Sequence, residues 1–229
     1  MKTLDIIVPV YNEERTLEEI VKKIEQTDYC GLEKNIIFID DCSTDSSPEI
    51  LAKYPKYTVL YHEKNRGKGA SISTGLMASK ADIVIIQDAD LEYNPSDYNI
   101  ILPYIKNGEY QVVYGSRFLD KKNKESFMIL SFLANKFLTF VTNILFGCNV
   151  TDMETCYKAF SRQAIENIKI NSDKFEFEVE ITAKISKKGM KIKEVPISYN
   201  GRAYHEGKKV NAFDGLHALW ALFYYKFFN

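Results

Sequence analysis

Runs of apolar residues alternate with amphipathic segments along the first half of the chain. The runs are rich in β-branched residues, as buried strands are, whereas the segments between them repeat apolar residues every three or four positions, as helices do. We expect strands at 4–10, 35–40, 57–62, 83–87 and 110–114, and helices over 13–26, around 50–51 and over 68–79. Uniformly apolar strands predict an α/β fold with a Rossmann-like, mostly parallel central sheet and helices on both faces.

The pattern changes in the second half of the chain. Residues 127–146 are apolar and long enough to span a bilayer, but Asn135, Lys136 and Asn143 interrupt them, so a transmembrane helix is not expected. Polar residues three or four apart, beginning at Ser131, form one stripe on this predicted helix. Beyond it we expect a strand at 156–160, a helix over 176–187, a strand pair near 192–199 and an aromatic amphipathic helix over 214–228.

Charge is balanced overall but unevenly distributed. The 229 residues include 30 Lys and Arg against 31 Asp and Glu, which argues against a general nucleic-acid binder, because such a protein needs a basic face. Residues 1–100 hold 18 acidic and 11 basic residues, net −7, and residues 101–229 hold 13 acidic and 19 basic, net +6. The acidic part favours metal or nucleotide chemistry, and the basic part favours an anionic ligand or a membrane surface.

Two features indicate a cytoplasmic protein. Asp5 and Pro9 interrupt the first apolar run, which we interpret as a strand and not as a signal peptide. The four cysteines are scattered without any Cys-x-x-Cys pair, so free thiols are expected and a structural zinc site is not.

Because the chain has no repeat and no low-complexity linker, residues 1–229 are expected to form a single domain.

Two carboxylates one residue apart, Asp88 and Asp90, follow the fourth predicted strand. Side chains at this spacing can converge on one hard divalent cation, Mg²⁺ or Mn²⁺, which bridges a diphosphate. Glu92 is a candidate third ligand, and a second acidic pair at 40–41 follows another strand. Ligands of parallel sheets bind beyond such strand ends. The alternative interpretation is a solvated turn that caps a helix at Ser96.

Residues 65–69, Asn-Arg-Gly-Lys-Gly, have the composition of a phosphate-binding loop. They do not match a P-loop, because His62 stands where its first glycine belongs, nor the dinucleotide fingerprint, because Ile72 replaces its third glycine. The glycines still allow close backbone approach, and the following helix favours an anion at its N-terminus, near Lys68. A flexible connecting loop is the alternative.

Four basic residues, Arg117, Arg202, Lys208 and Lys209, are well placed to meet phosphate groups. Arg117 follows the predicted strand 110–114, and its planar guanidinium can bind a phosphate through two hydrogen bonds. Arg202 and Lys208 lie in a glycine-punctuated loop, 200–209, that can close over a ligand. For each of them the alternative is a solvated surface charge.

Five ordered segments carry a family resemblance: VPVYNE at 8–13, DDCSTD at 40–45, NRGKG at 65–69, DADLEY at 88–93 and GSR at 115–117. Together they make the chain similar to family 2 glycosyltransferases with the GT-A fold. The branch it most resembles comprises the dolichyl- and polyprenyl-phosphate mannosyl- and glucosyltransferases. The resemblance covers the whole chain and implies a nucleotide-sugar-binding half at 1–116, an acceptor-binding half at 117–210 and a C-terminal aromatic amphipathic helix at 211–229.

The resemblance implies a role for each matching residue. Nucleotide-sugar binding is implied for Pro9, Tyr11, Glu13, Asp41, Lys68, Asp88, Ala89, Asp90, Arg202 and Lys208, with Asp41 reading the base. Binding of the metal, Mg²⁺ or Mn²⁺, is implied for Asp88, Asp90 and Glu92. Arg117 and Ser131 would meet the acceptor phosphate, and Asp152 and Arg117 are implied as the catalytic residues.

The implied reaction is a metal-dependent inverting transfer of a hexose from a UDP- or GDP-sugar to a polyprenyl or dolichyl phosphate. A phosphate is mostly dianionic at neutral pH, so cations suffice to position it. Residues 118–135 contain no Arg, although this branch often has further Arg and Ser there. An alternative acceptor therefore stays open: a hydroxyl of a cell-surface glycan, with Asp152 as the general base.

The two apolar segments, 127–146 and 214–228, also bear on where the protein acts. A helix dense in aromatic residues beside lysine is compatible with a membrane surface. We expect a peripheral enzyme at the inner face of the cell membrane, with a membrane-protein partner or a homodimer as a further way to cover these helices. No nucleic-acid partner is expected.

Overall fold

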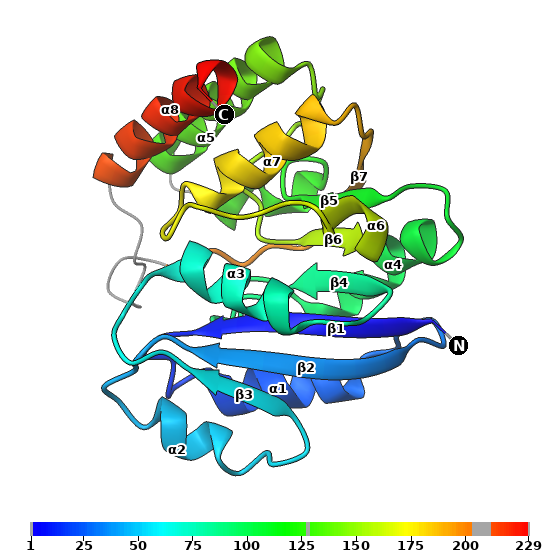
Figure 1. The fold of residues 1–229 in the computed structure, drawn as a ribbon, viewed down its shortest axis with the longest axis vertical. Coiled ribbons are helices and arrows are strands. Elements are labelled where there is room, and N and C mark those ends of the chain that lie inside the picture. The colour runs from blue at the N-terminus through cyan, green and yellow to red at the C-terminus, as the bar shows by residue number, and fades with distance from the viewer. Residues whose placement is uncertain (1, 127–128, 203–211, 229) are drawn as a thin grey trace.

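A seven-stranded sheet forms the centre of the computed structural model, which describes residues 2–126, 129–202 and 212–228 (Figure 1). Its strands are β1 (Thr3–Val10), β2 (Glu33–Asp40), β3 (Thr58–Tyr61), β4 (Ile83–Ile86), β5 (Val112–Ser116), β6 (Lys158–Ser161) and β7 (Ile192–Pro196). They lie in the order β3-β2-β1-β4-β6-β5-β7. All neighbouring pairs are parallel except the two that include β6, so the expected mostly parallel sheet is confirmed.

Helices cover both faces of this sheet, as expected. In Figure 1, α3 (Lys68–Ala78) and α7 (Phe177–Lys187) lie in front of the sheet, and α1 (Leu17–Gln26) and α4 (Tyr98–Lys106) lie behind it. The connections contain the short helices α2 (Ser47–Leu51) and α6 (Arg162–Ile165) and the 3₁₀ turns η1 (Pro95–Asp97) and η2 (Lys121–Ser126). Cover on both faces explains why strands such as β4, Ile-Val-Ile-Ile, are buried along their whole length.

The antiparallel strand β6 runs between β4 and β5. Because of this direction, the loop that precedes β6 lies at the edge where the parallel strands end. Two hydrogen bonds join this loop to β5 there: Gly115 N donates to Tyr157 O at 2.8 Å, and Thr155 Oγ1 donates to Gly115 O at 2.6 Å. The acidic residues of this loop therefore reach the same edge as the polar ends of the first strands.

A second, smaller core lies outside the sheet, where α5 (Ile129–Phe146) and α8 (Ala212–Phe227) pack beside each other and against α7 (Figure 1). The buried apolar residues of this core are Leu138, Val150, Met153, Val179, Ala183, Ala218, Ala221, Leu222 and Tyr225. By length and composition alone, α5 could cross a membrane, and it is the single such helix among the described residues. Only 17% of it is buried inside the structure.

Three details differ from the sequence-based expectations. The apolar pattern does not predict α4, which contains Pro103 in its interior. Only one strand forms near 192–199, because the residues beyond β7 contribute just an isolated bridge between Tyr199 and Tyr93. Helix α1 begins four residues later than expected, since a turn precedes it in which the backbone amide of Leu17 donates to the carbonyl of Glu13 at 3.0 Å.

Candidate active site

The carboxyl end of β4 leads directly into Asp88, which forms an ion pair with Lys68 in the first turn of α3. Lys68 Nζ lies 2.8 Å from Asp88 Oδ1 and 3.6 Å from Glu178 Oε1 on α7. Burial by itself would lower the pKa of Lys68, but the two carboxylates outweigh it and raise the pKa well above its ordinary value. Lys68 is therefore a fixed positive charge between β4 and α7.

A second buried lysine, Lys158 on β6, extends this network. Its ammonium donates to Met153 O at 2.9 Å, to Thr155 O and to the Glu178 carboxylate. A buried ammonium is costly unless all its protons find acceptors, so these contacts hold the loop before β6 against α7. The sequence-based reasoning missed Lys158 and Glu178. The available signal was a lysine within an otherwise apolar strand.

Arg202, which follows β7, brings three carboxylates together. Its Nη1 lies 3.2 Å from Glu13 Oε2, its Nη2 lies 3.2 Å from Asp90 Oδ2, and its Nε lies 3.8 Å from Glu92 Oε1. Glu92 also accepts hydrogen bonds from the Arg202 amide at 2.9 Å and from the Tyr199 hydroxyl at 2.8 Å. The segment after β7 is thereby tied over the ends of β1 and β4, where residues predicted for the donor meet.

These carboxylates are not fully neutralised. Burial, together with repulsion from Asp88 and Glu92, raises the pKa of Asp90 to about 7, and Arg202 offsets this only in part. Burial acts on Asp88 in the same direction, but Lys68 outweighs it and lowers the pKa of Asp88. Arg202 therefore compensates only part of the burial and repulsion that act on Asp90. Among the described residues, however, no group of three Asp, Glu, His or Cys side chains already converges as a metal site.

Asp41, at the end of β2, holds the loop 65–69 in place. Its Oδ2 accepts a hydrogen bond from Gly67 N at 2.7 Å, and its Oδ1 accepts one from Arg66 N at 2.9 Å and lies 2.6 Å from His62 Nδ1. The side chain is buried, and its contacts fasten β2 to the start of α3. Its role in reading the base stays a prediction.

The two glycines of this loop are required by close backbone packing. Gly67 has φ 98°, and a Cβ atom there would lie 2.5 Å from Asp173 O. A Cβ atom on Gly69 would lie 2.3 Å from Ser172 O. The amide of Ala70 also donates to Asp173 O at 3.0 Å, so the segment before α7 takes one of the free amides at the start of α3. The loop is therefore anchored, in contrast to the alternative of a flexible connection.

The turns after β1 and β2 are fastened to each other. Asn12 N donates to Ser43 Oγ at 3.0 Å, and Thr44 N donates to Asn12 Oδ1 at 2.7 Å. Asn12 has φ 51°, in the left-handed region that asparagine tolerates better than most residues. Pro9, within β1, and Tyr11, directly after it, adjoin this junction in the chain. Their roles in nucleotide binding stay predictions, as does that of the buried Ala89.

Arg117 and Asp152 form a buried, doubly hydrogen-bonded ion pair beyond β5. Arg117 Nε donates to Asp152 Oδ2 at 2.8 Å, and Nη2 donates to Oδ1 at 2.7 Å. Glu194 on β7 holds the loop from the other side, because it accepts hydrogen bonds from the amides of Asp152 and Thr151 at 3.1 and 2.7 Å. No described residue forms a hydrogen bond with Arg117 Nη1. The two residues implied as catalytic thus neutralise each other and leave one guanidinium nitrogen unengaged by described residues.

The polar stripe of α5 faces this ion pair. Asn135 Nδ2 donates to Asp152 Oδ1 at 3.4 Å, and the Thr139 hydroxyl donates to Asn135 at 3.1 Å and accepts from Met153 N at 3.1 Å. Ser131 lies one turn earlier on the same stripe, without a hydrogen bond to any described residue. Its place beside the acceptor phosphate stays a prediction, and Lys208 lies outside the described residues.

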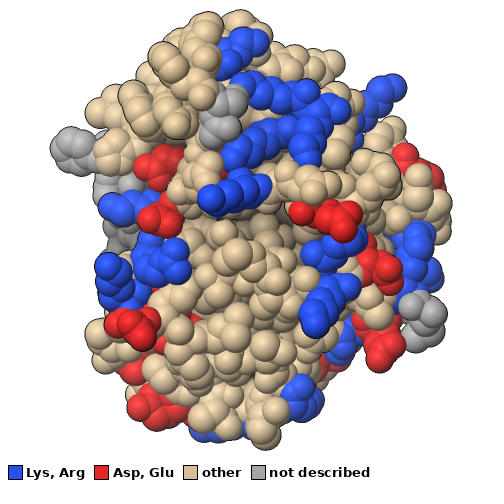
Figure 2. All heavy atoms as spheres, viewed as in Figure 1, with Lys and Arg blue, Asp and Glu red and all other residues tan. Residues whose placement is uncertain are grey.

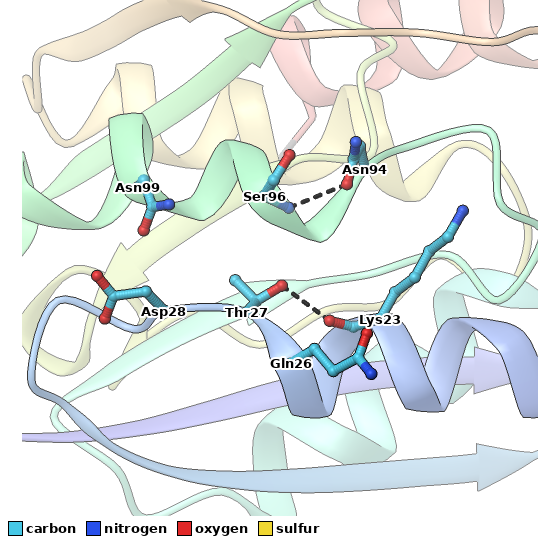
Figure 3. Close-up of a pocket in the computed structure, with 7 residues that line it drawn as sticks. All are labelled: Lys23, Gln26, Thr27, Asp28, Asn94, Ser96 and Asn99. Atoms are coloured by element: carbon cyan, nitrogen blue, oxygen red, sulfur yellow. Dashed lines mark hydrogen bonds between the residues drawn. The ribbon is translucent and has the colours of Figure 1, made fainter.

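Two surface hollows lie apart from this edge of the sheet. One, of about 310 Å³, separates the end of α1 from η1 and α4, and Figure 3 shows its polar lining: Lys23, Gln26, Thr27, Asp28, Asn94, Ser96 and Asn99. The other, of about 410 Å³, lies between the segment 171–176 and α8. Neither hollow contains a residue predicted for the site. At the site itself, the side chains of Lys68 and Arg202 bridge the carboxylates.

Comparison with known proteins shows the family to which the chain belongs. The model of glycosyl transferase family 2 matches residues 5–169. An uncharacterized protein of Methanocaldococcus jannaschii is 33% identical over 97% of this chain and 92% of its own length. A UDP-N-acetylglucosamine–dolichyl-phosphate N-acetylglucosaminyltransferase of Methanococcus voltae is 27% identical over 96% of this chain and 95% of its own length.

Solved structures share the fold. The crystal structure of glucosyl-3-phosphoglycerate synthase from Mycobacterium tuberculosis in complex with Mg²⁺ and UDP superposes with a TM-score of 0.75 at 20% identity, covering 98% of this chain and 79% of that one. The expected GT-A fold is thereby confirmed. Since the family model spans most of the chain and the strand-end carboxylates lie within the matched residues, the chain belongs to glycosyl transferase family 2 and is a glycosyltransferase.

Proposed function

We propose that this glycosyltransferase moves a hexose from a UDP- or GDP-sugar to a polyprenyl or dolichyl phosphate, with the help of a divalent cation. The observation that supports a metal-bound nucleotide-sugar donor is the excess of carboxylates at the ends of β1 and β4. Among the described residues, Arg202 is the one cation that forms ion pairs with Asp90 and Glu92, and it also pairs with Glu13. Such an excess favours a ligand that brings positive charge, and a metal-bound diphosphate is one.

The chemistry of the cluster fits Mg²⁺ or Mn²⁺. Both prefer carboxylate oxygens. Burial and repulsion from Asp88 and Glu92 raise the pKa of Asp90 although Arg202 pairs with it, and a bound divalent cation would relieve that repulsion. Asp88 and Asp90 would hold the metal, which, when bound, stabilises negative charge on the leaving diphosphate. Arg202 would move from the carboxylates to the diphosphate, and Lys68 would keep Asp88 ionised. The Mg²⁺ and UDP in the Mycobacterium tuberculosis enzyme support this assignment.

The Arg117–Asp152 pair supports a phosphate as the acceptor in preference to a hydroxyl. A hydroxyl acceptor needs a general base with a free lone pair. Asp152 accepts hydrogen bonds from Arg117 Nε, Nη2 and amide nitrogen and from Asn135, so its oxygens are occupied. Arg117 still offers Nη1 to a phosphate oxygen. A phosphate that attacks the anomeric carbon from the face opposite the diphosphate gives inversion, and the name of the Methanococcus voltae relative agrees with a lipid-phosphate acceptor.

The surface of α5 and α8 supports an acceptor held in a membrane. We define the apolar face of these helices by its exposed residues: Ile129, Leu130, Leu133, Phe137, Phe140, Ile144, Leu216, Trp220, Phe223 and Phe227. Trp220 is 66% exposed and Phe140 is 62% exposed. Figure 2 shows a largely uncharged surface at the top, where Figure 1 places α5 and α8, with Lys and Arg side chains gathered beside it. An apolar face flanked by lysines fits an anionic lipid surface.

Sedimentation with liposomes tests the membrane assignment. The protein should sediment with vesicles that contain anionic lipid, and less so at high salt, because salt screens the lysines. The double variant Phe140→Ser/Trp220→Ser should stay in the supernatant, whereas Met77→Ser, which changes an equally exposed residue on α3, should behave as wild type. Equal recovery with and without vesicles would contradict the assignment. A dimer in that supernatant would show that a second copy covers the face instead.

Transfer itself is tested with a panel of radiolabelled UDP- and GDP-sugars and two matched acceptors, farnesyl monophosphate and farnesol. We expect labelled product in the organic phase with the phosphate acceptor only, and only with Mg²⁺ or Mn²⁺ present. The two acceptors differ in the phosphate alone, so the comparison isolates its contribution. Product from farnesol, or none from any combination, would contradict the proposed function.

A further inference from the structure

Glu154 is a carboxyl group at the acceptor side of the site that none of the roles above uses. It lies in the loop that precedes β6, between Asp152 and Thr155, whose hydroxyl is bound to the carbonyl of Gly115 at the end of β5. The next residue, Cys156, donates its amide to the Tyr93 hydroxyl at 3.1 Å. The backbone that follows Glu154 is therefore fixed at the edge where β4 and β5 end.

The side chain of Glu154 differs from its acidic neighbours in having a buried oxygen without a partner. Its Oε1 is buried and forms no hydrogen bond with any described residue, although the residue as a whole is partly exposed. Asp152, two residues earlier, accepts from Arg117 through both oxygens, and Glu178 is bound to Lys158. A buried carboxyl oxygen without a donor is expensive, and native proteins retain such groups mainly where a ligand or function uses them.

The charges around Glu154, together with its burial, determine whether it is protonated. From α7, Glu178 repels it, as does Asp152 in its own loop, while Lys158 on β6 and Arg117 beyond β5 attract it. Burial, with Glu178 next, dominates and raises the pKa of Glu154 to about 7. Near neutral pH a large fraction of Glu154 is therefore the neutral acid, which, unlike a carboxylate, can donate a hydrogen bond.

We propose that Glu154 contacts the acceptor phosphate as a protonated acid and donates a hydrogen bond to one of its oxygens. This inference rests on the phosphate acceptor proposed above. In the ionised form Glu154 would repel a phosphate dianion held by Arg117, so the two charges cannot be accommodated side by side without a proton. The acid adds a hydrogen-bond donor to a side of the site where residues 118–135 contain no arginine.

The proposal predicts a proton taken up on binding. A dianion next to Glu154 raises its pKa further, so a molecule ionised before binding gains a proton when the phosphate arrives. Calorimetric titration of farnesyl monophosphate at pH 7.5, in buffers of different ionisation enthalpy, should show uptake on the order of half a proton or more. Glu154→Gln should bind the same ligand without uptake. Binding to wild type without proton uptake would overturn the proposal.

The pH dependence of transfer gives a second, independent measurement. For wild type, kcat/KM for farnesyl monophosphate should fall about tenfold per pH unit above about 7, as Glu154 ionises. In Glu154→Gln the amide still donates but does not titrate. This variant should therefore stay within a few-fold of wild type at pH 7, lose the alkaline decline and exceed wild type roughly tenfold at pH 8.5. Glu166→Gln, an exposed glutamate beyond the far end of β6, should keep the wild-type profile.

The outcomes separate the two proposals. No transfer to farnesyl monophosphate by wild type would overturn the proposed function, and the role of Glu154 with it. Transfer with a profile that stays flat between pH 7 and 9 would overturn the role of Glu154 alone. A folded Glu154→Gln protein that is inactive at every pH would also overturn it, because that result identifies Glu154 as a base and not as a hydrogen-bond donor.

Discussion

The arginines on the donor and acceptor sides of the site differ in how many carboxylates they pair with. On the donor side, Arg202 is shared by Glu13, Asp90 and Glu92 at 3.2 to 3.8 Å. On the acceptor side, Asp152 is the one carboxylate among the described residues that pairs with Arg117, through two side-chain hydrogen bonds of 2.8 and 2.7 Å. Both arginines follow strand ends, yet among the described residues the Arg202 cluster has more carboxylates than cations, whereas Arg117 and Asp152 form a one-to-one ion pair.

This difference predicts different consequences of substitution on the two sides of the site. A cluster with more carboxylates than cations is costly by itself and gains from an incoming cation, so its geometry suits a metal-bound donor. A balanced, buried pair resists change, because removal of either partner leaves an uncompensated charge. We therefore expect substitutions on the donor side to alter ligand binding, and substitutions in the acceptor-side pair to alter stability.

The largest expected effect is that of Asp90→Asn on transfer. Loss of the carboxylate that we propose to hold the metal should lower kcat/KM by roughly 10³-fold in the radiolabel assay, since a bound metal would supply several kcal/mol of charge stabilisation. The fold should survive, because Asp90 already carries part of a proton near pH 7. Asp82→Asn, an exposed aspartate at the opposite edge of the sheet, serves as the matched control. Equal losses of kcat/KM in the two variants would show that Asp90 holds no metal that transfer needs.

Next in size is the effect of Asp152→Asn on stability. The change leaves the buried Arg117 without a counter-charge and should lower the free energy of unfolding by about 3 kcal/mol. Urea denaturation followed by circular dichroism measures it. A loss below about 1 kcal/mol would mean that the pair contributes as little as an exposed ion pair, and the contrast between the two sides would fail.

Arg202→Gln should tighten the binding of Mn²⁺ to the free protein. The arginine is the cation that the carboxylates share, so its removal should raise the affinity on the order of tenfold, while transfer falls because the diphosphate loses its clamp. Electron paramagnetic resonance of free Mn²⁺ measures the affinity without turnover. Weaker Mn²⁺ binding in the variant would show that Arg202 does not compete with the metal for these carboxylates.

The smallest expected effect is that of Glu13→Gln on stability, which is the counterpart of Asp152→Asn. Arg202 keeps Asp90 and Glu92 when Glu13 is neutralised, so the free energy of unfolding should change by less than about 1 kcal/mol. The same urea denaturation applies. A loss as large as that of Asp152→Asn would show that the donor-side carboxylates are not in excess.

The sequence predicted the sheet and its functional edge well, for a physical reason. Strands buried on both faces are apolar along their length, so 4–10, 35–40 and 83–87 were recognisable, and the polar residues after them had to lie at one edge. The antiparallel direction of β6 could not be predicted, because the apolar pattern of a strand does not show whether it pairs parallel or antiparallel with its neighbours. That direction is what brings Asp152 and Glu154 to the site.

Ion pairs between residues far apart in the sequence could not be predicted either. Arg117 and Asp152 are 35 residues apart, and Arg202 and Glu13 are 189 apart, so no local spacing links them. The glycines at 67 and 69 had the composition of a phosphate loop, but the structure shows that backbone packing at 172–173 requires them. A residue type indicates what chemistry is available, whereas only the fold decides which partner takes it.

Calorimetric titration of UDP- and GDP-sugars with and without Mn²⁺ measures whether the donor-side carboxylates bind a nucleotide sugar together with a metal. We expect wild type to bind one of them only when Mn²⁺ is present, and Asp90→Asn to bind neither. Binding of equal strength with and without Mn²⁺, or no binding of either donor with Mn²⁺ present, would contradict this expectation.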